Sequence, residues 1–214
     1  MSNGKSILVD ISLCTACRGC QVACKQWNGL PGTKTKQIGT YQNPQDLSSD
    51  TYKIVRFAEG KKENGKPYWY FFSDMCRHCV DPPCMEKAGD LSAIYRDKPT
   101  GAVIYTKVTK KLDPEEIIES CPYNIPRMGK DGALAKCTMC LDRQQANMVP
   151  ACVQSCPTGA MVFGERSAIL TEAKSRVEAL KGAYPKAQAI DADSVRVIFI
   201  VSDDPRKYHE YAAS

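Results

Sequence analysis

Residues 14–24 read CTACRGCQVAC and space four cysteines as C-x2-C-x2-C-x3-C. In this spacing the first three thiols hold one 4Fe–4S cubane, and the fourth thiol crosses to a neighbouring cubane. A neighbouring cluster is therefore expected, and its remaining ligands must come from elsewhere among the twelve cysteines of the chain. The assignment of those other cysteines decides how the whole sequence is interpreted.

The other cysteines form two groups of four. The first group lies in CRHCVDPPC (76–84) and SCPYNIP (120–126), and the second lies in KCTMCLDRQQANMVPACVQSCPTGA (136–160). Cys121 and Cys156 are each followed by proline, as the last cysteine of the iron–sulfur run is, whereas Cys24 is followed by Lys25. Twelve cysteines divide into three sets of four with none left over, so the sequence predicts three 4Fe–4S clusters.

The crossing of the fourth ligand predicts how the thiols are shared. Cluster 1 takes Cys14, Cys17, Cys20 and Cys156; cluster 2 takes Cys24, Cys137, Cys140 and Cys152; cluster 3 takes Cys76, Cys79, Cys84 and Cys121. A sequential assignment, in which each run keeps its own thiols, stays open. His78 is expected beside cluster 3 or facing solvent rather than as a ligand, and His209 is expected to be solvated.

Two other uses of the cysteines are weighed against iron–sulfur clusters. Twelve cysteines in 214 residues fall below the density of a small disulfide scaffold, and closely spaced thiols are poorly placed for bridges. Zinc also suits C-x2-C pairs, and it would explain residues 137–156. Zinc does not explain the run of four cysteines or the Cys-Pro endings, so it remains the weaker alternative.

Composition describes a globular protein, with 43% hydrophobic and 25% charged residues. No stretch approaches the roughly 18 apolar residues of a membrane span, and the N-terminal MSNGKSILVDIS lacks an apolar signal core. The formal charge of +5 is roughly cancelled by three cubanes of about two negative charges each, so nucleic-acid binding is not predicted. Most of the scattered lysines are expected on a solvated face, and some are expected to help hold the anionic clusters or a partner protein: Lys34, Lys36, Lys53, Lys61, Lys62 and Lys66.

Periodicity and turn residues predict short elements around the cysteines. Strands are expected over 5–11, 51–58, 68–72, 93–96, 102–106 and 195–201, and helices over 18–27, 113–121 and 168–183. Asn64-Gly65 is a hairpin turn, and Asp113 caps the helix that Pro114 opens. Residues 28–50 are expected to be a loop that covers a cluster, faces a partner or simply connects. The aromatic residues 68–72 are expected in the core or a subunit interface, and the tail 202–214 is not expected to form core.

These motifs resemble the iron–sulfur subunits of molybdenum and tungsten oxidoreductases of the dimethyl-sulfoxide-reductase type. The resemblance covers about residues 5–165 and is carried by CTACRGCQVACKQWN, CRHCVDPPC, SCPYNIPR and PACVQSCPTGAM. It implies an α+β fold of two bacterial-ferredoxin-like modules, one inserted in the other, with short β-hairpins and a C-terminal helix and strand. It implies a first module with two clusters (1–70 plus 131–165), an inserted module with one (71–130) and a C-terminal extension (166–214).

The chain departs from the usual pattern of that family, in which sixteen cysteines hold four cubanes. Ala88, Lys111, Pro114 and Ile117 stand where the missing cysteines would be. These positions are the complete ligand set of one cluster, so a single site is absent as a unit.

Within the family, the residues KQWN after Cys24 and the three-cluster design resemble the small (beta) subunits of soluble formate dehydrogenases from sulfate-reducing bacteria. The resemblance implies an electron-transfer subunit without catalytic residues of its own. A large subunit with a tungsten or molybdenum bis-pterin cofactor would oxidise formate, and a periplasmic multihaem cytochrome c would accept the electrons. Export together with the large subunit would place the protein in the periplasm, and a cytoplasmic location is the alternative.

Other functions remain open from the sequence. The same relay could serve a nitrate, polysulfide, thiosulfate or dimethyl sulfoxide reductase. A zinc-dependent structural or nucleic-acid-binding module and a free-standing ferredoxin are the remaining hypotheses. The sequence contains no GxGxxG, phosphate-binding glycine loop or evident nucleophile–base pair, which favours electron transfer over catalysis in this chain.

Overall fold

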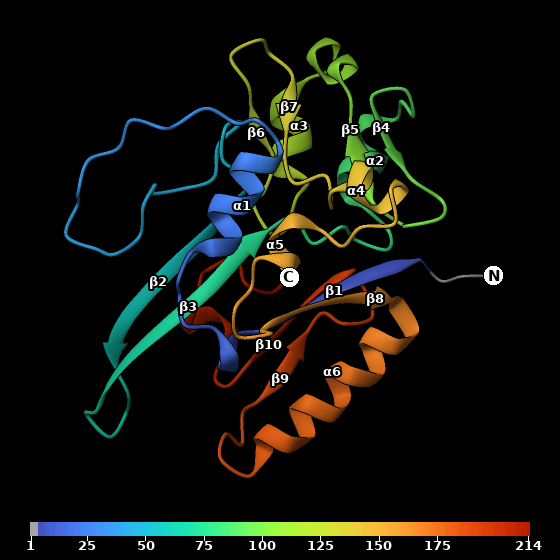
Figure 1. Ribbon diagram of the computed structural model, residues 1–214. Helices are drawn as coiled ribbons and strands as arrows, with labels where there is room; N and C mark the ends of the chain where they lie inside the picture. The colour runs from blue at the N-terminus through green and yellow to red at the C-terminus, as the bar shows by residue number, and fades with distance from the viewer. Residues whose placement is uncertain (1–3) are drawn as a thin grey trace.

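A four-stranded sheet forms the base of the computed structural model, which describes residues 4–214 (Figure 1). In spatial order its strands are β8 (Met161–Glu165), β1 (Lys5–Asp10), β10 (Val197–Val201) and β9 (Gln188–Ile190). β1 pairs in parallel with β10 and antiparallel with β8. Every residue of β10 is buried, which explains its continuous apolar sequence VIFIV, because a strand covered on both faces needs no polar side.

One long helix and one hairpin pack against this sheet. Helix α6 (Arg166–Lys181) contacts β1, β8, β9 and β10, and its own Ile169 and Ala173 are buried. The hairpin consists of β2 (Lys53–Lys61) and β3 (Pro67–Met75). Phe72 of β3 stacks on Phe199 of β10 with ring centroids 4.6 Å apart. The predicted helix 168–183 and both hairpin strands are therefore confirmed, with shifted ends.

A second, smaller core lies at the other end of the molecule, at the top of Figure 1. Its elements are α2 (Pro83–Ala88), β4 (Ile94–Arg96), β5 (Val103–Tyr105), the 3-10 turn η2 (Lys107–Lys111), α3 (Pro114–Glu119), β6 (Arg127–Met128) and β7 (Leu134–Ala135). The buried side chains that these elements share are Ala93, Ile94, Val103, Ile117 and Leu134. Asp113 caps α3 as predicted, because its carboxylate accepts a hydrogen bond from the Glu115 amide at 2.9 Å.

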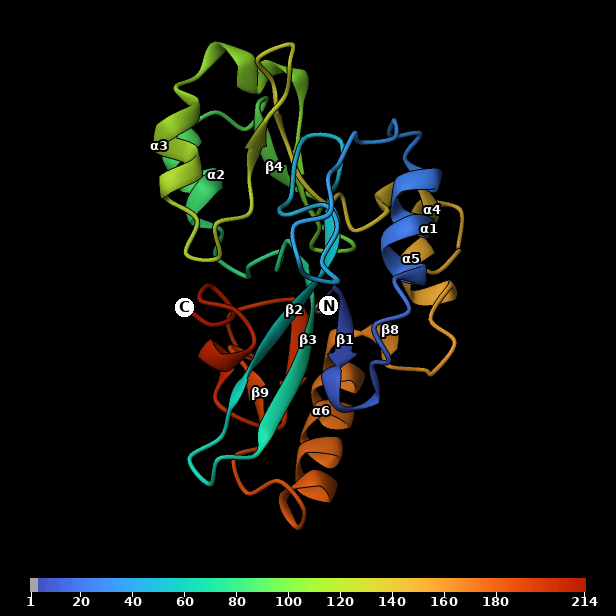
Figure 2. The ribbon, with the colours of Figure 1, turned by 90° about the vertical axis from the view of Figure 1, so that its left-hand side faces the viewer.

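Three short helices next to the first and last cysteine runs lie close together in Figure 2. They are α1 (Gly19–Trp27), α4 (Leu141–Gln145) and α5 (Ala151–Gln154), and α1 packs directly against α5. The 3-10 turn η1 (Ile11–Leu13) leads from β1 into the first cysteine run. The fold thus brings residues 14–24 beside residues 136–156, although more than a hundred residues separate them.

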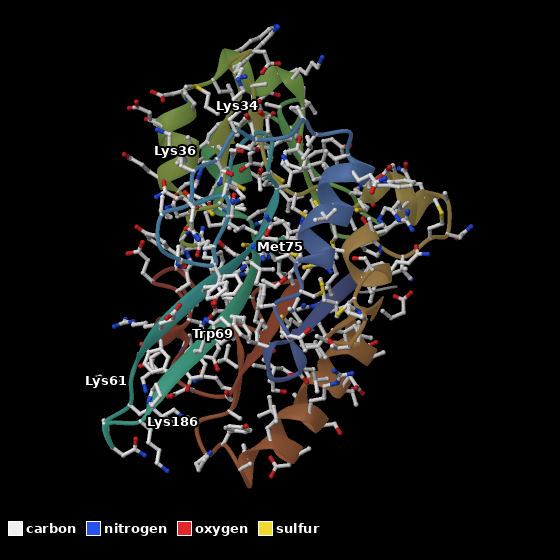
Figure 3. All side chains as sticks on the ribbon, turned by 60° about the vertical axis from the view of Figure 1, so that its left-hand side comes forward. Lys34, Lys36, Lys61, Trp69, Met75 and Lys186 are labelled. Atoms are coloured by element: carbon white, nitrogen blue, oxygen red, sulfur yellow. The ribbon has the colours of Figure 1, made fainter. Side chains whose placement is uncertain are left out.

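The hairpin β2–β3 extends from the interior to the surface. Figure 3 shows Met75 near helix α1 at one end of the hairpin, and Trp69 and Lys61 towards the opposite end. Trp69 is 49% exposed and contacts the ring of Tyr41, whereas Phe72 is buried. The aromatic run 68–72 is therefore split between core and surface. Within the described chain, residues 28–50 form no helix or strand, as predicted.

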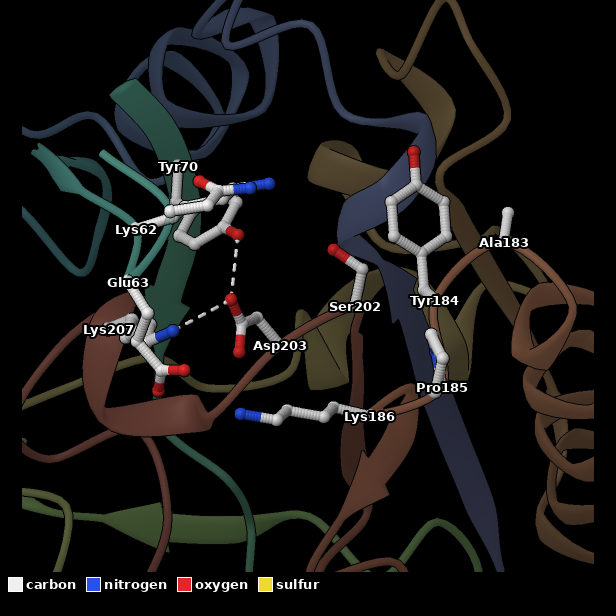
Figure 4. A pocket seen from close by; sticks show the side chains of 11 residues that line it. Lys62, Glu63, Tyr70, Ala183, Tyr184, Pro185, Lys186, Ser202, Asp203 and Lys207 are labelled. Carbon is white, nitrogen blue, oxygen red and sulfur yellow. Dashed lines mark hydrogen bonds and ion pairs between the residues drawn. The ribbon is translucent and has the colours of Figure 1, made fainter. Parts of the chain in front are cut away.

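The C-terminal tail was predicted to stay outside the core, and this prediction is wrong. Tyr208 is 3% exposed and stacks on Tyr70 with centroids 4.4 Å apart, and Ala212 is fully buried. The Tyr70 hydroxyl donates to Asp203 at 3.0 Å, and Lys207 forms an ion pair with the same carboxylate (Figure 4). The 3-10 turn η3 (Pro205–Lys207) lies in this tail. One tyrosine stack, a buried alanine and a polar cluster therefore hold a segment whose composition is mostly polar.

His209 in the same tail is also not solvated, contrary to the prediction. Its side chain is 14% exposed, and Nε2 lies 3.9 Å from a carboxylate oxygen of Asp74. Burial lowers the pKa of His209 to about 4. The charges of Arg56 and Arg77 also lower this pKa, whereas the charge of Asp74 raises it. The histidine is consequently neutral in the folded protein near pH 7.

The expected module ranges are linked by strand pairing. β1 and β8 join the segments 1–70 and 131–165, of which residues 1–3 lie outside the described residues. Strand β3 crosses residue 70, and the C-terminal segment 166–214 adds β9 and β10 to the sheet. None of the helices in residues 4–214 combines the length and apolar character needed to span a bilayer.

Candidate iron–sulfur sites

Three cysteine runs share one unusual backbone turn. Ala16, His78 and Met139 each stand two residues after a cysteine and have φ values of 54°, 47° and 57°. L-residues other than Asn and Asp rarely adopt this left-handed conformation. Each of the three amides donates to the sulfur of the cysteine two positions earlier, at 3.3–3.4 Å. The turn therefore directs a backbone donor at a thiol, as hydrogen bonds tune iron–sulfur ligands.

Sites 1, 2 and 3 are the ligand sets expected for clusters 1, 2 and 3. Site 3 consists of Cys76 after β3, Cys79, Cys84 in α2 and Cys121 after α3. All four thiols line one pocket. Burial raises the pKa of Cys79 to about 12 and that of Cys121 to about 11. The protons on such thiols are displaced when cationic metal binds.

His78 lies in the wall of the site 3 cavity and is fully buried. Its Nδ1 accepts a hydrogen bond from the Val103 amide at 3.0 Å, and Nε2 makes no hydrogen bond within residues 4–214. Burial lowers its pKa, so the ring is neutral and Nε2 carries the hydrogen. A buried N–H without a protein acceptor fits a site whose occupant supplies sulfur acceptors.

Site 1 consists of Cys14, Cys17, Cys20 and Cys156, which line a second pocket. It is the more open site, because Cys17 is exposed. The Ser73 hydroxyl lies 3.6 Å from the sulfur of Cys20. Burial alone would raise the pKa of Cys156, but the Thr158 hydroxyl and neighbouring backbone amides hold it below its usual value. These donors favour the thiolate that binds iron.

Site 2 consists of Cys24, Cys137, Cys140 and Cys152, and all four side chains are buried. α1 supplies the first cysteine and α5 the last. Burial raises the pKa of Cys24 to about 12, and the charges of Cys152 and Cys140 act next in the same direction. The structure therefore brings Cys24 next to the cysteines from the far end of the chain, in the grouping that the crossing predicted.

The spacing of the thiols fits a polynuclear group. A single zinc ion bound at about 2.3 Å by each sulfur holds its thiolates roughly 4 Å apart. Among residues 4–214, no three Cys, His, Asp or Glu side chains are placed to hold one metal ion together. The four thiols of site 1 and the four thiols of site 3 instead converge on one pocket each. An all-thiol donor set around such a space matches the ligand demand of a 4Fe–4S cubane.

The place of the absent fourth ligand set is occupied by apolar packing. Ile117 is 1% exposed at the centre of the small core, and Ala88 packs against that core. Pro114 is the first residue of α3, and Lys111 ends the turn η2 at the surface. A capped helix and an aliphatic side chain thus stabilise the region where relatives of the wider family would place a cluster.

Two buried lysines accompany the cysteines, and sequence reasoning missed both. Lys53 was assigned to a solvated face but is 1% exposed, and Lys136 is 5% exposed. Burial lowers the pKa of Lys53, yet nearby cysteines, Cys20 foremost, raise it above its ordinary value. The strand alternation could have indicated its position, because it places Lys53 on the same face as Val55, which lines site 1.

Comparison with known proteins supports the iron–sulfur interpretation. A family model described as a 4Fe–4S dicluster domain matches residues 67–166. The formate dehydrogenase subunit beta of Megalodesulfovibrio gigas is 49% identical over 98% of this chain and 99% of its own length. Formate dehydrogenase 2 subunit beta (cytochrome c-553) of Nitratidesulfovibrio vulgaris is 47% identical over 97% of this chain and 98% of its own length.

A more distant relative extends the same pattern. The nitrate-inducible formate dehydrogenase iron–sulfur subunit of Escherichia coli is 36% identical over 94% of this chain and 70% of its own length. Cysteine spacing, the grouping of thiols around cavities and near-full-length similarity agree with one another. The chain therefore belongs to the family of formate dehydrogenase beta subunits, the iron–sulfur subunits that transfer electrons within an oxidoreductase complex.

Proposed function

We propose that this subunit relays electrons from the large catalytic subunit through three 4Fe–4S clusters, held by sites 1, 2 and 3. The observation that carries the proposal is the convergence of four thiols on each of two pockets. A third group is formed by four buried cysteines, in which burial and the charges of Cys24, Cys140 and Cys152 raise the pKa of Cys137. When bound, a cubane supplies one-electron redox chemistry over a span of about a volt, set by its surroundings. The residues of this chain hold the cubanes, exclude water and direct amides at their sulfurs.

Site 2 is the middle member of the relay. The pKa of Cys137 in site 2 is raised first by burial, then by the charge of Cys24, and next by the charge of Cys76 in site 3. On the other side, the buried Lys53 interacts with Cys20 of site 1 and Cys152 of site 2. These contacts support the order site 1, site 2, site 3, in which either outer cluster exchanges electrons with a partner protein.

The same groupings support a nested arrangement of two ferredoxin-like modules. The segments 1–70 and 131–165 would form the module of sites 1 and 2, because β1 pairs with β8 and α1 packs on α5. Residues 71–130 would be the inserted module with site 3 and the apolar core in place of a fourth site. Residues 166–214 would be an extension that completes the sheet with β9 and β10.

The partners follow from family membership. The large subunit would oxidise formate at a tungsten or molybdenum bis-pterin cofactor, and a multihaem cytochrome c would receive the electrons. The name of the Nitratidesulfovibrio vulgaris relative includes cytochrome c-553, which is consistent with a haem protein as acceptor. Export together with the large subunit would place the complex in the periplasm.

Anaerobic purification of the complex with its large subunit tests the proposal. We expect about four irons per cubane and hence about twelve irons in this subunit, with absorbance near 400 nm that bleaches when formate is added. Formate should reduce a dye, and then a cytochrome c, at rates that depend on this subunit. About eight irons would contradict the three-cluster count. Zinc without iron, or clusters that formate does not reduce, would contradict the function itself.

A further inference from the structure

Two lysine ammonium groups lie inside the protein without a carboxylate partner. Nζ of Lys53 is 3.3 Å from the Ser73 carbonyl oxygen and 3.0 Å from the sulfur of Met75. Nζ of Lys136 donates to the carbonyl oxygens of Val103 at 2.6 Å and Cys137 at 3.1 Å. Neither lysine forms an ion pair with Asp or Glu in the described part of the chain. A buried cation is costly unless an anion compensates it, so these positions call for nearby negative charge.

Lys53 stands at the junction of sites 1 and 2. Its partner residue Ser73 lines the site 1 cavity, where the Ser73 hydroxyl approaches Cys20. Towards site 2, the strand β2 that carries Lys53 packs against α1, which contains Cys24. The charge of Lys53 also opposes the effect of burial on the pKa of Cys152. The ammonium therefore acts on thiols of both sites.

Lys136 stands at the junction of sites 2 and 3. Its side chain lines the site 3 cavity, and its Nζ lies 4.6 Å from the centroid of the Tyr105 ring in the same wall. Burial raises the pKa of Cys84 in site 3, and the charge of Lys136 is the strongest effect that lowers this pKa. Its other anchor is the carbonyl of Cys137, a residue of site 2. The two lysines thus occupy equivalent positions at successive junctions.

We propose that Lys53 and Lys136 are internal counter-cations, one at each junction between neighbouring clusters, which raise the reduction potentials of the clusters on both sides. The inference rests on the proposed function, because it requires all three clusters. Each transfer oxidises one cubane by one electron and reduces the next by one electron, and no bond or proton moves. A cation between two cubanes stabilises the added electron on either of them, so it raises both potentials without favouring transfer in one direction.

Redox titration of the complex with its large subunit tests the proposal, with cluster signals followed by EPR and absorbance. Lys53→Met should lower two potentials of this subunit, those of clusters 1 and 2, and leave the third unchanged. Lys136→Met should lower those of clusters 2 and 3, so one signal responds to both substitutions. For each affected cluster we expect at least a tenfold fall in the reduced-to-oxidised ratio at fixed potential, which is about 59 mV for one electron.

Matched variants separate charge from packing. Lys53→Gln should reproduce the shifts of Lys53→Met, and Lys53→Arg should restore values near those of the unmodified protein. Lys61→Met, at the exposed end of the same strand, should change no potential (Figure 3). Iron content is measured for every variant. If a Met variant loses iron, full iron content in the corresponding Arg variant supports the role of charge, and iron loss in both overturns it.

The outcome distinguishes this inference from the proposed function. An iron-replete Lys53→Met or Lys136→Met variant with unchanged potentials would overturn the counter-cation role while the three-cluster relay still stands. A shift of all three potentials by one substitution would also overturn it, because the effect would not be local to a junction. If the unmodified protein carries fewer than three clusters, the proposed function fails first, and the inference fails with it.

Discussion

The two halves of the segment 71–130 are stabilised by different means. Around site 3, four cysteines line a pocket, and burial raises the pKa of three of them, Cys79, Cys84 and Cys121. Around Ile117, the small core is closed by aliphatic packing, and α3 is capped by Asp113. One half therefore needs a bound group to complete it, and the other is complete as protein. The comparison teaches that two neighbouring halves of one segment can be completed differently, one by thiols around a pocket and the other by a hydrophobic core.

Removing a ligand from the middle site should have the largest effect on function. Cys152→Ala removes one thiol of site 2, where every ligand is buried and no exposed side chain can replace it. We expect loss of about four irons per subunit and at least a hundredfold lower formate-dependent reduction of the acceptor. Iron analysis and acceptor assays of the complex measure both.

Cys17→Ala in the exposed part of site 1 is the matched ligand control. It should also lose one cluster, but it leaves the connection between sites 2 and 3 intact, so the remaining cluster signals should still interact. Full acceptor reduction by an iron-depleted Cys152→Ala complex would remove site 2 from the relay.

The largest effect on stability is expected at Asp74, which lies in β3, two residues before Cys76. Its carboxylate is 1% exposed and accepts from Arg56 at 2.7 Å and Arg77 at 3.2 Å. Asp74→Asn leaves the buried Arg77 guanidinium without an anion and leaves Arg56 paired only with the half-exposed Asp46, which should cost about 3–5 kcal/mol. At about 2–4 °C per kcal/mol for a chain of this size, Tm should fall by roughly 6–20 °C.

Asp46 provides the control for Asp74, because it pairs with the same Arg56 but its side chain is 47% exposed. Asp46→Asn should therefore lower stability by no more than about 1 kcal/mol. Equal losses of Tm in the two variants would show that burial does not decide the strength of this ion-pair network.

Ile117→Ala tests the half that holds no cluster. The side chain is 1% exposed, and its loss should cost about 2–5 kcal/mol through lost burial and the cavity left behind. Iron content should stay unchanged, because no atom of Ile117 lines the site 3 cavity. Thermal unfolding and iron analysis measure the two quantities, and Leu91→Ala, at a position 71% exposed, is the control. Iron loss from Ile117→Ala would mean that the two halves depend on each other.

Cysteine spacing and local patterns predicted much of this structure. The alternation of 51–58 and the turn Asn64-Gly65 indicated the hairpin, and the 3.6-residue periodicity indicated α6. The crossing of Cys24 to the far end of the chain followed from a motif whose geometry is fixed by the cubane. Patterns of this kind are local, or they are tied to a cofactor with fixed ligand geometry.

Features that depend on long-range packing were not predicted. β9 has only three residues, and its pairing with β10 is decided by the sheet rather than by its own sequence. The burial of Lys53 contradicts the usual exposure of lysine, because its place is set by the packing of β2 against β3 and α1. Tyr208 and Ala212 are isolated apolar residues in a polar tail, and only tertiary contacts with β3 and the sheet bury them.

The smallest expected effect concerns the pH dependence of stability and depends on His209 in the C-terminal tail. Because the pKa of His209 is about 4 when folded and near 6.5 when unfolded, the unfolded chain binds more protons between these values. Stability should therefore fall as pH drops from 6.5 towards 4, and His209→Gln should remove about 1–2 kcal/mol of that fall. Tyr211→Phe, which keeps the neighbouring ring, should leave the pH dependence unchanged. Tm measured at pH 7 and pH 5, at equal iron content, decides the point: parallel losses in His209→Gln and the unmodified protein would assign the acid sensitivity to the cysteine sites instead.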